Sequence, residues 1–144
     1  MPALKQAPVG KKKFLIKNEK QLETVFSRVF SPMFYEKIVK RALYRFRITP
    51  ENIARVNQYV SEDRGHSFIT VFFKTKKVLT DNDNRLFQKD FRKILNATGY
   101  NGKVKGNKKF KELYGKSRRA VEVPIIWKAK SLGGCYCMLF ERFS

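Results

Sequence analysis

The stretch "RGHSFITVFF", residues 64–73, decides how this sequence can fold. It is rich in β-branched and aromatic residues, a composition that favours a β-strand. Because side chains alternate across a strand, the stretch presents two different faces. The face suited to packing under helices consists of Gly65, Ser67, Ile69, Val71 and Phe73. The opposite face carries a guanidinium, the only imidazole of the chain and two aromatic rings, on Arg64, His66, Phe68, Thr70 and Phe72.

The composition indicates a folded, very basic chain. Its 144 residues correspond to one domain, and 42% hydrophobic residues are enough to build a core. The chain has 32 Lys and Arg against 12 Asp and Glu, a net charge of +20. Such an excess indicates a polyanionic partner, which could be nucleic acid, an anionic membrane surface or an acidic protein. Nucleic acid is the favoured partner, with RNA ahead of DNA.

The two cysteines and the hydropathy of the chain indicate where in the cell the protein is expected. Cys135 and Cys137 lie one residue apart, which suits neither a disulfide nor a zinc site, so we expect two semi-buried apolar thiols in a reducing compartment. An apolar run long enough to span a membrane is absent, and the N-terminus lacks the apolar centre of a signal peptide. We therefore expect an intracellular protein of the cytoplasm or nucleus, or a virion protein if the source is a virus.

The N-terminal third contains an expected basic arm and a helix. Residues 1–18 are predicted to be a flexible basic arm preceding a single domain at 19–144. Residues 23–30 alternate with a period of two and read as a strand, although a helix over 19–30 fits the same residues. Residues 31–46 predict an amphipathic helix, with Ser31 as its N-cap and Pro32 in its first turn.

The remaining two thirds predict a hairpin, a second helix and a basic loop. Residues 53–60 and 66–73 form the two hairpin strands, joined by a turn over 61–65. A helix over 84–98 follows, capped by Asp81 or Asp83. Residues 99–120 read as a long basic loop, and residues 120–130 and 135–143 as two further strands.

This order of elements predicts an α+β fold. Two helices separated by a hairpin are typical of a ferredoxin-like β1-α1-β2-β3-α2-β4 antiparallel sheet, with both helices on one face and an extra C-terminal hairpin strand. Such an arrangement leaves the other face of the sheet open.

The same stretch resembles the RNA-recognition motif (RRM). The third strand of that family carries a basic residue, glycine, an aromatic, a small residue and a further aromatic. The segment "RGHSFITV", residues 64–71, is similar, with His66 in place of an aromatic and Val71 in place of a core aromatic. The segment "VFSRVF", residues 25–30, resembles the first-strand signature. The resemblance implies RNA bases stacked on the sheet, with Phe26 and Arg28 beside the third strand.

A second resemblance is to basic RRM-like proteins of giant double-stranded DNA viruses. It is carried by "IARVNQYV", "RGHSFITVFF" and "PIIWK" in this order along the chain. It implies a viral protein and a place in the virion.

Two functional readings follow from these observations. In the first, a non-catalytic protein binds nucleic acid, with bases stacked on the aromatic face and phosphates held by basic clusters. The candidate residues of this site are Arg64, His66, Phe68, Phe72, Phe26, Arg28, Lys11, Lys12, Lys13, Lys103, Lys105, Lys108, Lys109, Lys111, Arg118 and Arg119. In the second, a small basic structural component of a virion or ribonucleoprotein uses the sheet face as a protein interface, with acidic or structural proteins as partners.

An enzyme is not expected. The chain has one histidine, no cluster of His, Cys and acidic residues at ligand spacing, and no glycine-rich phosphate loop. We therefore expect no cofactor and no metal.

Overall fold

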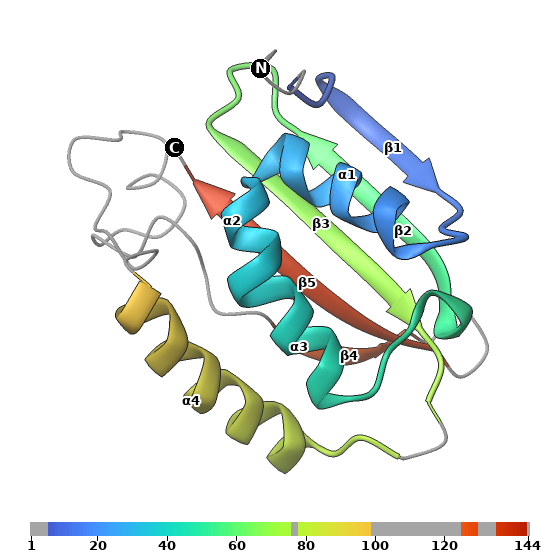
Figure 1. Ribbon diagram of the computed structural model, residues 1–144, viewed down its shortest axis with the longest axis vertical. Helices are drawn as coiled ribbons and strands as arrows, with labels where there is room; N and C mark the ends of the chain where they lie inside the picture. The colour runs from blue at the N-terminus through green and yellow to red at the C-terminus, as the bar shows by residue number, and fades with distance from the viewer. Residues whose placement is uncertain (1–5, 76–77, 99–124, 130–134, 144) are drawn as a thin grey trace.

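The fold was obtained as a computed structural model, which describes residues 6–75, 78–98, 125–129 and 135–143. Five strands and a series of helices alternate along the chain (Figure 1). The elements are β1 (Gly10–Phe14), α1 (Glu19–Val29), α2 (Pro32–Phe34), a π-helical turn (Tyr35–Val39), α3 (Lys40–Arg45), a 3-10 turn (Pro50–Asn52), β2 (Ile53–Val60), β3 (His66–Phe73), α4 (Asp81–Thr98), β4 (Ile125–Ala129) and β5 (Cys135–Phe143).

The strands form one antiparallel sheet in the order β1-β2-β3-β5-β4. The α+β class predicted from the sequence is therefore confirmed. The ferredoxin-like strand order is wrong, because in that order the first strand lies inside the sheet, whereas β1 is an edge strand here. The helices lie on one side of the sheet, where α1 crosses its β1–β3 half and α2–α3 lie over β3 and β5 (Figure 1).

The strand predicted over residues 23–30 is a helix, the alternative that the sequence left open. Leu22, Val25, Phe26 and Val29 are buried at helical spacing on α1. The Asn18 side chain caps the helix by accepting a 2.9 Å hydrogen bond from the Gln21 backbone N–H. Burial of this stripe against the sheet decides in favour of the helical period.

The flexible arm predicted for residues 1–18 contains a strand. Residues 10–14 pair with β2, from Gly10 opposite Val60 to Phe14 opposite Val56. Three consecutive lysines occupy the middle of this strand and are exposed. Lysine-rich edge strands are a common protection against pairing with other chains. The prediction of an unpaired arm is therefore wrong for residues 10–14, whose lysines belong to a sheet edge.

The predicted hairpin and the helix after residue 30 are confirmed. The later helix, α4, is also present, but another residue caps it. Ser31 caps α2 by accepting a 2.9 Å hydrogen bond from the Phe34 backbone N–H. At α4 the cap is Thr80 rather than an aspartate: its hydroxyl accepts from the Asp83 N–H, and the Asp83 carboxylate accepts from the Thr80 N–H. This reciprocal pair is a capping box. No helix within the described residues is long and apolar enough to cross a membrane.

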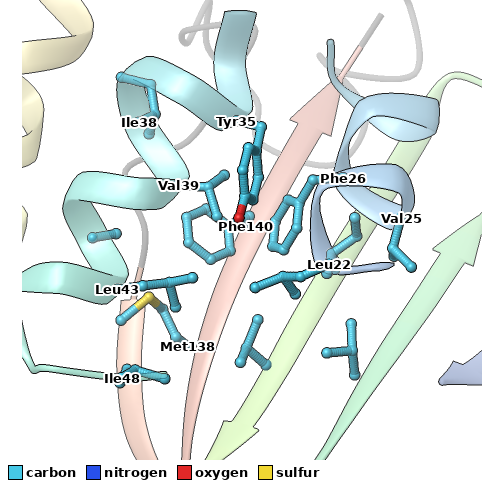
Figure 2. Close-up of a cluster of buried hydrophobic side chains, with 14 of the residues drawn as sticks. Leu22, Val25, Phe26, Tyr35, Ile38, Val39, Leu43, Ile48, Met138 and Phe140 are labelled. Atoms are coloured by element: carbon cyan, nitrogen blue, oxygen red, sulfur yellow. The ribbon is translucent and has the colours of Figure 1, made fainter. Parts of the chain in front are cut away.

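The core lies between the helices and the sheet (Figure 2). Phe26 of α1 packs edge-on against Phe140 of β5, with ring centroids 5.1 Å apart, and it also contacts Tyr35. Ile69 and Val71 of β3 are part of the core, and they lie on the face of the strand that the alternation predicted to be buried. Phe26 has no exposed surface, so its ring contributes its full apolar area to this layer.

We predict that Phe26→Ala lowers the free energy of unfolding by about 3–5 kcal/mol, because it opens a cavity in this layer. Tyr44→Ala is the matched control, since the Tyr44 side chain is 82% exposed, and it should change stability by less than about 0.5 kcal/mol. Urea unfolding followed by circular dichroism measures both. Equal effects of the two substitutions would contradict the placement of Phe26 in the core.

Candidate nucleic-acid interface

The face of the sheet turned away from the helices is the candidate interface, and we call it the outer face. Its described members follow from the strand registers, in which directly paired residues share a face. They are Lys11 and Lys13 of β1, Arg55, Asn57 and Tyr59 of β2, His66, Phe68, Thr70 and Phe72 of β3, and Cys135, Cys137, Leu139 and Glu141 of β5.

Three rings gather at the end of the outer face next to the β2–β3 turn. Tyr59 and Phe68 are paired across the hairpin and stack, with centroids 5.1 Å apart and planes 27° apart. The His66 ring lies 5.7 Å from Phe68 and 5.9 Å from Tyr59. All three side chains are half-buried. The prediction that His66 and Phe68 share a face away from the core is confirmed, and together with Tyr59 they form what we call the ring cluster.

A carboxylate fixes the imidazole of the ring cluster. His66 Nε2 lies 2.9 Å from Glu141 Oε2, and the two side chains are only 21% and 19% exposed. Among the described residues of the outer face, Glu141 is the only acid. Its charge is therefore engaged locally, and the rest of the described outer face is neutral or positive.

At the opposite end of the outer face, the Phe72 ring contacts an arginine and two cysteines. The Arg55 guanidinium lies over the Phe72 ring, 4.8 Å from its centroid, a cation–π contact. Cys135 and Cys137 are buried against the same ring as free thiols. Burial is the main reason that the pKa of the Cys137 thiol rises to about 11. Phe72, a predicted site residue, lies on the outer face and is half-buried like the three rings of the ring cluster, with the Arg55 guanidinium over its ring.

The lysines of β1 divide between the two faces of the sheet. Lys11 pairs with Tyr59 and Lys13 with Asn57, so both lie along the edge of the outer face. Lys12 pairs with Gln58, which is buried on the helix side, so Lys12 belongs to the other face. The edge next to the ring cluster thus carries two exposed ammonium groups.

Three predicted site residues lie elsewhere. Phe26 is in the core, because the segment that carries it is a helix. Arg28 is exposed on the last turn of the same helix. Arg64 is in the β2–β3 turn, where its guanidinium donates a 2.7 Å hydrogen bond to the Ala7 carbonyl oxygen. The predicted loop at 99–120 lies outside the described residues. So do the seven remaining basic candidates, which belong to it: Lys103, Lys105, Lys108, Lys109, Lys111, Arg118 and Arg119.

Sequence reasoning overlooked Tyr59 and Arg55. Both belong to a strand that was correctly predicted, and the short turn at 61–65 joins it to β3. Laying the two strands against each other places Tyr59 opposite Phe68 and Arg55 opposite Phe72. The signal was therefore the cross-strand register rather than either strand alone.

Comparison with known proteins finds no matching family model, curated protein or solved structure. The described residues include no group of three or more His, Cys, Asp and Glu side chains that could hold a metal ion. The chemistry of the outer face is therefore argued from its own side chains.

We predict that the Cys137 thiol reacts at least about 100-fold more slowly than a free cysteine with an alkylating reagent at pH 8. A thiol with a raised pKa holds less thiolate at every pH below that value, and only the thiolate reacts. Stopped-time alkylation read by tandem mass spectrometry gives the rate at each cysteine, and labelling in guanidinium chloride gives the unfolded reference. Native labelling at the free-thiol rate would contradict burial at this end of the outer face.

Proposed function

We propose that this protein binds single-stranded nucleic acid on the outer face without catalysing a reaction, with RNA as the favoured ligand and DNA as the alternative. The observation that carries the proposal is the ring cluster of Tyr59, His66 and Phe68, half-buried beside the exposed Lys11 and Lys13. The chemistry needs rings that a base can stack on and cations that a phosphate can reach, and both occur at one end of one sheet face.

The arrangement favours unpaired bases. Bases in a duplex are stacked on each other, so only a single strand can lay its bases on protein rings. Stacking of this kind contributes about 1–3 kcal/mol per base and tolerates any base, because every base has a π-face. The carboxylate of Glu141 supports the platform by holding the His66 ring at 2.9 Å.

RNA is placed ahead of DNA because of the RRM-like segment at residues 64–71. The strand order of the sheet differs from the ferredoxin-like order, so support comes from the chemistry of the face and not from the topology. The common element is the use of a sheet surface as a base-stacking platform.

Charge supplies the sequence-independent part of the proposed affinity. The net charge of +20 would draw in any polyanion, and Lys11 and Lys13 place part of it beside the rings. The predicted basic segment at residues 103–119 would add phosphate contacts. Binding of this kind weakens as salt rises, because each neutralised phosphate releases counterions.

The second candidate function is a structural one, as a basic component of a virion or ribonucleoprotein whose outer face contacts protein. It is favoured by the Phe72 end, where the outer face leaves two apolar side chains, Phe72 and Leu139, partly exposed. Partly exposed apolar side chains of this kind also suit the core of a protein interface. In that case the positive charge would neutralise nucleic acid or acidic partners without base stacking.

The double substitution Tyr59→Ala and Phe68→Ala should weaken binding of a single-stranded oligoribonucleotide more than tenfold at fixed salt, because both stacking rings are lost. The salt dependence should stay as in the unmodified protein, since no charge changes. Fluorescence anisotropy with a labelled oligonucleotide measures both quantities.

Tyr44→Ala removes an exposed ring from α3 and serves as the control, with no expected change in affinity. An unchanged affinity of the double variant, together with a steep salt dependence, would reject base stacking and favour the structural function. Failure of the unmodified protein to bind RNA or DNA at low salt would reject both candidate functions.

The β1 lysines offer a second test based on their opposite faces. Lys11→Gln with Lys13→Gln should lower the slope of log affinity against log salt by about 1.4, which corresponds to two phosphate contacts on a single strand. The pair Lys12→Gln with Lys17→Gln removes the same charge away from the outer face and should change the slope much less. Equal changes for the two pairs would show that the nucleic acid does not follow the outer face.

A further inference from the structure

The edge of β1 that faces away from β2 is open to a further strand. β1 is the last strand at its end of the sheet, and no described strand pairs with its other edge (Figure 1). An unpaired strand edge presents backbone N–H and C=O groups on which another chain can form a ladder. Exposed apolar side chains stand at both ends of the strand: Val9 before it is 43% exposed, and Leu15 after it is 76% exposed. The free edge of β1 is therefore a candidate surface for a protein partner.

The hydrogen bonds of the hairpin show which residues of β1 face the free edge. Ser61, the residue after β2, donates its N–H to the His66 carbonyl oxygen at 2.9 Å. Because the bonding side alternates from residue to residue, the odd-numbered residues at this end of β2 bond to β3 and the even-numbered residues bond to β1. Lys12 is paired with an even-numbered residue, so its backbone groups are used within the sheet. Lys11 and Lys13 therefore direct their N–H and C=O groups at the free edge.

The charge of this edge decides what kind of strand it accepts. Lys11, Lys12 and Lys13 are exposed, and none of the ion pairs among the described residues involves them. A second copy of this chain would bring the same lysines and a net charge of +20, so repulsion opposes pairing of two copies. A strand that carries carboxylates is attracted instead, because opposite charges stabilise cross-strand pairs. Repulsion of one partner and attraction of the other together make the edge selective for an acidic segment.

A groove beside β1 offers a place for apolar side chains of such a segment. It measures about 400 Å³ and lies between the end of β1, the connection to α1 and one side of α1. Phe14, Leu15 and Val25 contribute to its apolar lining. Its charged members, Lys20 and Arg28, are both basic, and none of the residues that line it is acidic. The groove therefore fits an apolar side chain whose neighbours carry negative charge.

We propose that the free edge of β1 binds an acidic, extended segment of a partner protein, which joins the sheet as a further strand. The backbone groups of Lys11 and Lys13 supply the pairing, and side chains of the added strand alternate between the two faces. Its carboxylates lie on the outer face next to these two lysines, and its apolar side chains lie on the helix side next to the groove. This surface goes beyond the proposed nucleic-acid function, because it needs neither a base nor the ring cluster.

A short peptide that alternates glutamate and valine is the probe, and calorimetry at fixed salt measures its affinity for the full chain. We expect it to bind at least about tenfold more tightly than a peptide of the same composition with glutamates and valines in two blocks. Its glutamates lie opposite Lys11 and Lys13, so their amides face β1. N-methylation of the glutamate amides should therefore abolish binding, and N-methylation of the valine amides should leave it in place. The probe contains no base or phosphate, so the result does not depend on nucleic-acid binding.

Two substitutions of Lys13 separate the backbone from the charge. Both Lys13→Pro and Lys13→Gln remove the ammonium group, but only proline also removes the N–H that faces the free edge. We expect Lys13→Pro to bind the alternating peptide about tenfold more weakly than Lys13→Gln, because a ladder hydrogen bond is lost and the proline ring blocks close approach. Circular dichroism confirms that each variant is folded.

The groove is tested by Leu15→Ser, which should weaken binding of the alternating peptide several-fold because an apolar contact is lost. Val78→Ser is the matched control, since Val78 is also 76% exposed but precedes α4, and it should leave the affinity unchanged.

Equal affinities of the alternating and block peptides, or of the two N-methylated peptides, would overturn the proposal, because binding would then rest on charge attraction without strand pairing. Equal binding of a peptide that alternates lysine and valine would overturn the selectivity for acidic segments. Sedimentation of the unmodified chain covers the remaining occupant of the edge. Self-association that Lys13→Pro removes would assign the edge to a second copy of this chain and reject an acidic partner.

Discussion

Strand β3 is paired with a neighbouring strand on both edges, and the rest of the molecule is arranged around that constraint. All eight of its residues pair with residues of β5, and seven of them also pair with residues of β2. A strand fixed in this way cannot rotate, so its two sets of side chains are committed to opposite faces. Ile69, Val71 and Phe73 anchor the helix layer, and the rings of His66 and Phe68 are left on the outer face. The core and the candidate site are thus two sides of one strand.

The sequence predicted those parts of the fold that depend on neighbouring residues, and it missed those that depend on contacts between distant residues. The alternation in β3 needs only neighbouring residues, and it placed residues 66–73 on the correct faces, although Arg64, which it put on the outer face, lies in the turn before the strand. Residues 23–30 satisfied the strand and the helix period equally, and the decision came from packing of Phe26 against Phe140, a contact between residues far apart in the chain. The strand order was also out of reach, because nothing in the segment 10–14 itself shows that it pairs with β2 at a sheet edge.

For the candidate site too, the residues that follow from a single strand were predictable, and those that need two segments to be aligned were not. His66 and Phe68 followed from one strand, while Tyr59 required the register of the hairpin. Charge, by contrast, was visible from composition alone. In the function that we propose, this charge attracts a polyanion, and the outer face is the place where it would be held.

The central claim is that nucleic-acid bases lie on the ring cluster. Ultraviolet cross-linking of a uniform oligouridine to the full chain, with the attachment sites located by mass spectrometry, tests that claim directly because it joins groups in contact. The account predicts cross-links at Tyr59, Phe68 or His66. It predicts none at residues on the helix side of the sheet. Cross-links confined to the helices, with β2 and β3 unlabelled while the oligonucleotide is bound, would contradict it.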